Sequence, residues 1–150
     1  MAPIQKGYSL VELMVVVGII AILAAIAIPL FMNYASVAEG AEGYALGGAL
    51  KSSIVTRFNN LGKWPTDNNS AGVATANSIT GTYVKSVTVT SGSQGSLITV
   101  LFKSKGVAKS LQGKNLYLAA MNAGGSVKWE CEVDSTNMYK YVPSTCRNKR

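Results

Sequence analysis

The fold is decided by the stretch Lys6-Gly7-Tyr8-Ser9-Leu10-Val11-Glu12, which precedes 20 uncharged residues from Leu13 to Met32. A helix rises about 1.5 Å per residue, so one of that length spans about 30 Å, the thickness of a bilayer's hydrocarbon core. The run is apolar on all sides, unlike the one-sided stripe of an ordinary surface helix. The sequence therefore predicts a membrane-spanning helix close to the N-terminus.

The pattern changes after Met32, where small residues become frequent and apolar positions follow helical spacing. We expect the helix to continue to about residue 60, because Gly62 can adopt a left-handed cap and Pro65 cannot continue a helix. The second half of the helix is predicted to pack on the rest of the domain through one stripe. Its positions are Tyr34, Val37, Ala41, Tyr44, Ala45, Gly48, Ile54, Val55 and Phe58.

Four strand-like runs follow a polar loop at residues 66–82 and are separated by turn signals. In the first run, alternation places Tyr83, Lys85, Val87 and Val89 on one face. Four strands in series predict an antiparallel sheet with one face on the helix, and so an α+β domain. The runs are Tyr83–Thr90, Leu97–Lys103, Asn115–Met121 and Ser126–Glu132.

The composition is poor in groups that perform catalysis. The chain has no histidine, which is the commonest general base and metal ligand, and only 7 acidic residues. It has no nucleophile motif, no phosphate-binding loop and no Cys/His cluster with metal-ligand spacing. We therefore predict that the protein is not an enzyme and has no catalytic residues, metal site or cofactor.

Positive charge is concentrated after the predicted helix. From residue 50 onward there are 13 basic and 4 acidic side chains, a balance of +9. Such a surface attracts polyanions, but it also keeps a protein soluble, and we favour the second interpretation. A candidate patch for salt-sensitive polyanion binding comprises Lys103, Lys105, Lys109, Lys114, Arg147, Lys149 and Arg150.

The two cysteines, Cys131 and Cys146, lie near the C-terminal end. No further ligands accompany them, so a disulfide is the better interpretation if the domain is exported. Closing a loop this short contributes about 3 kcal/mol in the chain-entropy model.

The segment from Lys6 to Glu12 resembles the N-terminus of type IV pilins, which have a short basic leader ending in glycine, then an aromatic residue, a glutamate and the apolar run. The resemblance implies that a prepilin peptidase cuts after Gly7 and N-methylates Tyr8. Phenylalanine is common at that position in the family, and Tyr8 departs from it while keeping the aromatic ring. The implied divisions are a cleaved leader (1–7), a membrane-anchor and filament-core helix (8–35) and a globular head (36–150).

The resemblance covers nearly all of the chain. The loop Trp64-Pro65-Thr66 and the segment Gly81–Val87 are similar to those of type IVa pilins, and the region from Trp129 to Cys146 resembles their disulfide-bounded C-terminal region. The family's fold is a long N-terminal helix whose second half packs on a four-stranded antiparallel sheet, followed by a disulfide-bounded loop.

Glu12 and Pro29 are the candidate assembly residues. A charged residue at mid-membrane costs roughly 2.5–3.5 kcal/mol on insertion scales, so Glu12 needs a partner. Processing creates a positive α-amino group at Tyr8, and in a filament Glu12 of one subunit can meet this group on its neighbour. The alternative is a carboxylate without a role in the headgroup layer. Pro29 removes a helix hydrogen bond, and the family's filaments can melt locally near this proline.

The predicted function is the major structural subunit of a type IV pilus, an extracellular filament used in adhesion, twitching motility or DNA uptake. The implied partners are further copies of the chain, a prepilin peptidase, an assembly platform with its ATPases, and host surfaces or DNA. Before assembly, we expect the precursor to span the inner membrane once, with its head in the periplasm.

Three alternatives share parts of this pattern. A minor pilin or a type II secretion pseudopilin would share the leader, Glu12 and the helix, although the paired cysteines favour a pilin. A secreted protein would use residues 13–32 as its signal sequence and be cut after Ser36-Val37-Ala38. Signal sequences have apolar regions of only about 7–15 residues, which argues against this last alternative.

Overall fold

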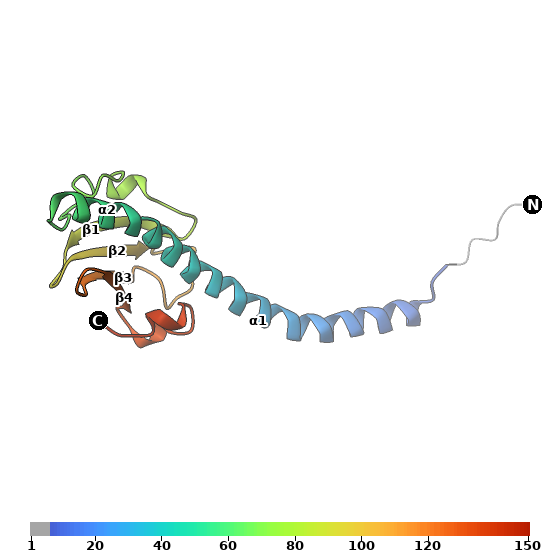
Figure 1. Cartoon of the computed structure of the whole chain (residues 1–150). Coiled ribbons are helices and arrows are strands. Elements are labelled where there is room, and N and C mark those ends of the chain that lie inside the picture. Colours follow the sequence, from blue (N-terminus) through green and yellow to red (C-terminus); the bar gives the residue numbers. More distant parts are fainter. Residues whose placement is uncertain (1–6) are drawn as a thin grey trace, which may run out of the picture. The chain divides into compact units, whose positions relative to one another are not determined.

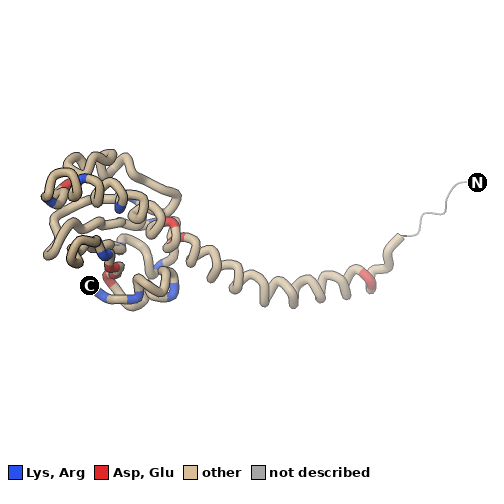
Figure 2. Tube along the Cα trace, viewed as in Figure 1, with Lys and Arg blue, Asp and Glu red and all other residues tan. Residues whose placement is uncertain are grey.

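The computed structural model describes residues 7–150 and divides the chain into two units that meet between Ala35 and Ser36 (Figure 1). The first unit contains the beginning of α1 (Leu10–Ala49), and no charge interrupts it between Leu13 and Met32 (Figure 2). The second unit holds the remaining elements, which are α2 (Lys51–Leu61), β1 (Val84–Ser91), β2 (Ser96–Phe102), β3 (Asn115–Asn122), β4 (Val127–Val133) and the short 3-10 helices η1 (Ala76–Ser78), η2 (Thr136–Met138) and η3 (Ser144–Cys146).

The predicted end of the helix is confirmed, with one interruption before it. Gly62 caps α2 in the left-handed conformation (φ 65°), and its N–H donates to the carbonyl of Phe58 at 2.8 Å. The N–H of Leu50 donates to the carbonyl of Gly47, three residues earlier, at 3.2 Å. This is a 3-10-type bond, whereas the regular α-helical bond reaches back four residues. Gly47 and Gly48, which weaken a helix interior, lie just before the break between α1 and α2.

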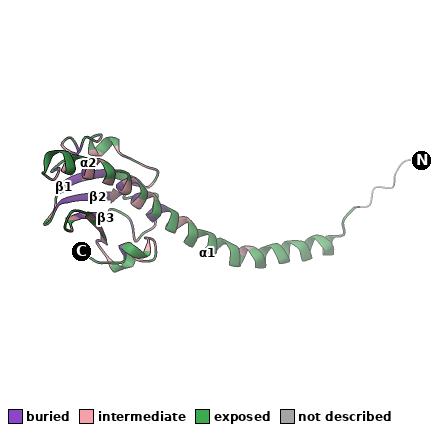
Figure 3. Ribbon diagram, viewed as in Figure 1, coloured by how far each residue is buried: buried purple, intermediate pink, exposed green. Residues whose placement is uncertain are grey.

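The four strands form one antiparallel sheet in the order β1-β2-β3-β4. Its pairing aligns buried residues into rows that cross the strands, and buried positions extend along β1 and β2 (Figure 3). This arrangement confirms the predicted α+β architecture. The two central rows are Val87, Val100, Leu116 and Val133, and Val89, Ile98, Leu118 and Cys131.

The first strand differs from its predicted alternation. Val84 is fully buried and Lys85 is exposed, and the pairing with β2 shifts between Val84 and Ser86. A β-bulge inserts an extra residue and changes which side chains face the core. The prediction that Lys85 shares a face with Val87 and Val89 is therefore wrong.

The helix packs through a different face from the one predicted. Its buried positions recur every three to four residues, as on one face of a helix, and are Glu39, Gly40, Gly43, Gly47, Leu50 and Ile54. Ile54 belongs to the predicted stripe and is buried. Four other members of that stripe are exposed: Tyr34, Val37, Ala41 and Ala45. Apart from Gly48, the predicted stripe follows residues that have side chains. It is wrong at these four exposed positions, because glycines form much of the buried face instead.

Glycine allows the helix backbone to lie directly against the sheet. A Cβ atom on Gly43 would lie 2.5 Å from Cζ of Phe102, and one on Gly47 would lie 2.8 Å from Cγ2 of Val100. Close-packed interiors have no room for atoms at such separations. Gly40 lies in the same way against the backbone of Tyr141 in the C-terminal segment. We call Gly40, Gly43 and Gly47 the glycine stripe, and infer that it sets how closely the helix approaches the sheet and this segment.

A pair of substitutions tests this packing. We expect Gly43→Ala to lower the free energy of unfolding by about 1–3 kcal/mol, because the core around Phe102 must move to admit a methyl group. Gly48 has open space around it, so Gly48→Ala should instead raise stability by about 0.5–1 kcal/mol. Urea unfolding of the full chain in detergent measures both. Equal effects at the two positions would contradict the role of the glycine stripe.

Two glutamates of α1, one turn apart, hold loops onto the helix. Oε2 of Glu39 accepts the N–H of Ala108 at 2.6 Å, in the connection between β2 and β3. Oε1 of Glu42 accepts the N–H groups of Tyr83 and Val84 at 2.9 and 3.2 Å, at the start of β1. Carboxylates thus satisfy backbone donors that the loops leave unpaired.

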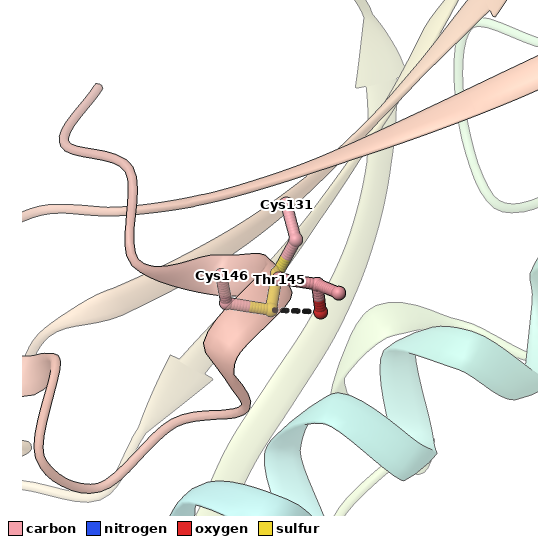
Figure 4. The surroundings of a disulfide bond; sticks show 3 residues. All are labelled: Cys131, Thr145 and Cys146. Atoms are coloured by element: carbon pink, nitrogen blue, oxygen red, sulfur yellow. Dashed lines mark hydrogen bonds between the residues drawn. A yellow bond between two sulfur atoms is a disulfide. The ribbon is translucent and has the colours of Figure 1, made fainter.

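A disulfide between Cys131 of β4 and Cys146 of η3 closes the C-terminal loop (Figure 4). Both cysteines are buried. The chain then returns beside β4, where the N–H of Val133 donates to the carbonyl of Asn148 at 2.9 Å and its carbonyl accepts the N–H of Arg150 at 3.1 Å. The predicted disulfide is confirmed.

Asp134 joins the end of β4 to β3. Its carboxylate accepts the backbone N–H and the side-chain amide of Asn115 at 2.6 and 3.1 Å, and the hydroxyl of Tyr117 at 2.7 Å. Burial raises the pKa of the Tyr117 phenol above its ordinary value of 10.0, and the hydrogen bond to Asp134 adds to this rise.

This raised pKa predicts a loss of stability at high pH. A group whose pKa is raised by folding stabilises the protein below its unfolded pKa, and the contribution disappears as pH rises past 10.0. We expect the free energy of unfolding to fall more steeply above that pH in the native chain than in Tyr117→Phe. Urea unfolding over this pH range measures the difference, and parallel curves for the two proteins would contradict it.

Candidate processing and assembly site

A reciprocal pair of hydrogen bonds closes the first turn of α1. The N–H of Ser9 donates to Oε2 of Glu12 at 2.8 Å, and the N–H of Glu12 donates to Oγ of Ser9 at 3.2 Å. This is a capping box, which satisfies two donors that a helix start leaves free. This role was not predicted from the sequence, although Ser-x-x-Glu before an apolar run is the signature of a capping box.

The capping box holds Glu12 close to the predicted cleavage point. Gly7 and Tyr8 are both exposed, Tyr8 to 90%, and they precede the cap directly. Residues 1–6 of the predicted leader lie outside the described part of the chain. Glu12 therefore has a local partner in Ser9, and its second carboxylate oxygen has no hydrogen bond to any residue from 7 to 150.

The first unit presents an apolar surface. Large hydrophobic side chains between Leu10 and Met32 are 51–74% exposed. The helical stretch that begins at Leu10 is long and apolar enough to cross a membrane, judged by length and composition. Because such a surface is unfavourable in water, it requires lipid or other helices to cover it.

Pro29 lies inside α1, which continues past it to Ala49. Proline has no N–H, so the carbonyl of Ala25 lacks its usual helical partner. Pro29 therefore does not end the helix. Local melting near Pro29 in a filament remains a prediction.

The candidate polyanion-binding residues fall into two groups. Lys103, Lys105, Lys109 and Lys114 follow β2, and Arg147, Lys149 and Arg150 lie beside the end of β4. Two of these charges have partners, because Lys103 donates to the carbonyl of Thr82 at 2.8 Å and Arg150 pairs with Glu132 at 2.8 Å. A polyanion-binding patch at the exposed positions stays a prediction.

Comparison with known proteins identifies the family. Residues 37–147 match pilin, a bacterial filament protein, and residues 3–28 match the prokaryotic N-terminal methylation motif. The chain belongs to the pilin family. The predicted resemblance and the pilin fold, with its long helix, four-stranded sheet and C-terminal disulfide, are both confirmed.

This pilin is similar to curated relatives over almost its whole length. It is 42% identical to fimbrial protein EcpC of Eikenella corrodens over 145 residues, which cover 97% of this pilin and 92% of the relative. It is 40% identical to type IV major pilin protein PilE of Neisseria gonorrhoeae over 166 residues, covering 99% and 97%. A fimbrial protein of Neisseria meningitidis serogroup B is 43% identical over 169 residues, covering 99% and 97%.

Proposed function

We propose that the chain is the major structural subunit of a type IV pilus, made as a membrane-anchored precursor and polymerised into a surface filament. One combination carries the proposal, namely a methylation-motif N-terminus, an exposed apolar helix and a disulfide-closed pilin head in the same chain. Similarity over 97–99% of the chain to a fimbrial protein and a type IV major pilin supports the same role.

The proposed processing site is the bond between Gly7 and Tyr8. A prepilin peptidase cuts this bond and methylates the new α-amino group of Tyr8. The methylation motif at residues 3–28 and the exposure of Gly7 and Tyr8 support this assignment. Cleavage leaves Ser9 and Glu12 in the mature chain, so it preserves both members of the capping box.

The precursor spans the inner membrane once, through the apolar run from Leu13 to Met32. The basic leader stays in the cytoplasm and the head lies in the periplasm, in line with the positive-inside tendency. Export exposes the head to an oxidising compartment, where Cys131 and Cys146 form their disulfide.

During assembly the apolar helices leave lipid and pack against each other in the filament core. This exchange replaces one apolar solvent by another, so an ATPase on the cytoplasmic side of an assembly platform supplies the work. Glu12 of an incoming subunit pairs with the α-amino group of Tyr8 on its neighbour. The pair fixes the axial register, because two opposite charges in an apolar core attract strongly only when adjacent.

A deletion strain tests the role of major subunit. We expect loss of surface filaments by electron microscopy, their return on complementation, and this chain as the principal protein in the sheared fraction. Filaments that persist without the chain would contradict the proposal and indicate a minor pilin. A chain absent from the sheared fraction, with protein secretion impaired instead, would indicate a pseudopilin.

Adhesion, twitching motility and DNA uptake are the proposed uses of the filament. Host surfaces and DNA reach the subunit through its head. The exposed lysines after β2, such as Lys105 and Lys109, and those beside β4 supply electrostatic contacts to polyanions, which salt weakens.

A further inference from the structure

A cleft of about 410 Å³ lies in the head, and its lining includes none of the residues proposed for processing and assembly. Tyr44 and Lys51 line it from the helices, and Trp129 lines it from β4. The lining is completed by Leu118 of β3, by Glu130, Cys131 and Glu132 of β4, and by Thr145 and Asn148 of the C-terminal segment. Its volume is in the range of small-molecule sites.

The cleft contains a cation, the ammonium group of Lys51. Nζ of Lys51 lies 5.2 Å from the ring centroid of Tyr44 and 5.4 Å from that of Trp129. The two rings attract the ammonium group and hold it in place. Within residues 7–150, no carboxylate pairs with it. Glu130 and Glu132 also line the cleft, but they alternate with Trp129 and Cys131 along β4, so their side chains leave the strand on the opposite face, and Glu132 pairs with Arg150. An anion on the Trp129 face of the cleft therefore meets the positive charge of Lys51.

Hydrogen-bonding groups without strong partners line the same cleft as Lys51. The hydroxyl of Thr145 has only a long contact of 3.9 Å with Sγ of Cys146 (Figure 4), and the side-chain amide of Asn148 has no hydrogen bond within the described chain. The outer edge of β4 adds backbone groups. Val133 bonds to the C-terminal segment along this edge, and because strand geometry repeats every two residues, the N–H and C=O of Trp129 point the same way. They have no backbone partner among residues 7–150.

The geometry favours a compact ligand over an extended peptide. A peptide that paired along β4 would need the position beside Cys131, about 4.8 Å away. Cα of Cys146 already lies 4.4 Å from Cα of Cys131. The disulfide therefore closes this edge to a continuous added strand, and leaves an anion site surrounded by separate donors and acceptors.

We propose that this cleft binds a saccharide residue that carries a carboxylate, such as a uronic acid. The carboxylate pairs with Lys51, and the hydroxyl groups bind Thr145, Asn148 and the backbone of Trp129. This inference goes beyond the proposed function, which assigns processing and assembly to Gly7, Tyr8, Glu12 and Pro29.

Isothermal titration of the full-length chain in detergent micelles with D-glucuronate tests the proposal. We expect saturable binding that Lys51→Gln weakens by at least about tenfold, since a hydrogen-bonded charge is lost. Lys85→Gln is the matched control, because Lys85 is an exposed lysine on β1 at the opposite edge of the sheet, and it should bind as the native chain does. D-glucose, which lacks the carboxylate, and acetate, which lacks the sugar, should each bind at least about tenfold more weakly.

Three results would overturn the proposal: no saturable binding of glucuronate, equal losses in Lys51→Gln and Lys85→Gln, or acetate binding as tightly as glucuronate. Acetate binding as tight as that of glucuronate would indicate a simple anion site that does not recognise the sugar. Thermal unfolding of Lys51→Gln checks that the variant is folded. Its pilus yield should be normal, which separates this cleft from filament assembly.

Discussion

Glu12→Gln is expected to lower pilus yield at least about tenfold while leaving membrane insertion and the first turn of α1 intact. Glutamine keeps an oxygen that accepts the N–H of Ser9, so the capping box persists, but the negative charge is lost. At about 4 Å and an effective dielectric near 20, the proposed charge pair with Tyr8 of the neighbour would be worth about 4 kcal/mol before desolvation is subtracted. Losing about 1.4 kcal/mol of this already changes an equilibrium tenfold. Sheared pili and membrane fractions, quantified separately, measure the two effects.

Ser9→Ala provides the matched control, because it removes the cap acceptor and keeps the charge of Glu12. We expect it to destabilise the first turn by about 1 kcal/mol and to leave most of the pilus yield. The opposite outcome, normal yield in Glu12→Gln and few pili in Ser9→Ala, would show that Glu12 serves the helix cap and not the contact between subunits.

Removal of the disulfide should lower the free energy of unfolding of the head by about 3 kcal/mol. The bond closes a loop with a sequence separation of 15, and the chain-entropy model gives this magnitude for a loop of that size. Chemical unfolding of Cys131→Ala/Cys146→Ala, compared with the native chain, measures the difference. A reductant separates the cross-link from side-chain packing, because it should destabilise the native chain and leave the double variant unchanged. Two free thiols in native protein would refute the disulfide.

Much of this fold can be predicted from local sequence features. The apolar run from Leu13 to Met32 needs only its length and lack of charge to predict a spanning helix. Gly62 and Pro65 mark the helix end through their own backbone preferences. The strands follow from alternation and turn residues, and the antiparallel meander from their direct succession.

The features that local patterns missed depend on contacts between distant segments. The glycine stripe carries no apolar signal, and its importance appears only when Gly43 meets Phe102 of β2. The bulge at Val84 is fixed by pairing with β2, and Glu39 finds Ala108 far along the chain. The capping box of Ser9 and Glu12 is different, because its spacing is local and recognisable from sequence.

The cleft around Lys51 also could not be predicted from local sequence patterns. Its lining comes from both helices, two strands and the C-terminal segment, and no spacing in the sequence relates Lys51 to Trp129. The processing segment, by contrast, is contiguous from Gly7 to Glu12, so the sequence alone could indicate its chemistry.

We propose that this chain is processed as a prepilin and exported into a surface filament. Intact-mass analysis with N-terminal sequencing, on protein sheared from the cell surface, tests it most directly. The predicted result is a chain that begins at N-methylated Tyr8, with a mass two hydrogens short because Cys131 and Cys146 are joined. A chain that begins near Glu39 would indicate an ordinary signal peptide and would contradict the filament account.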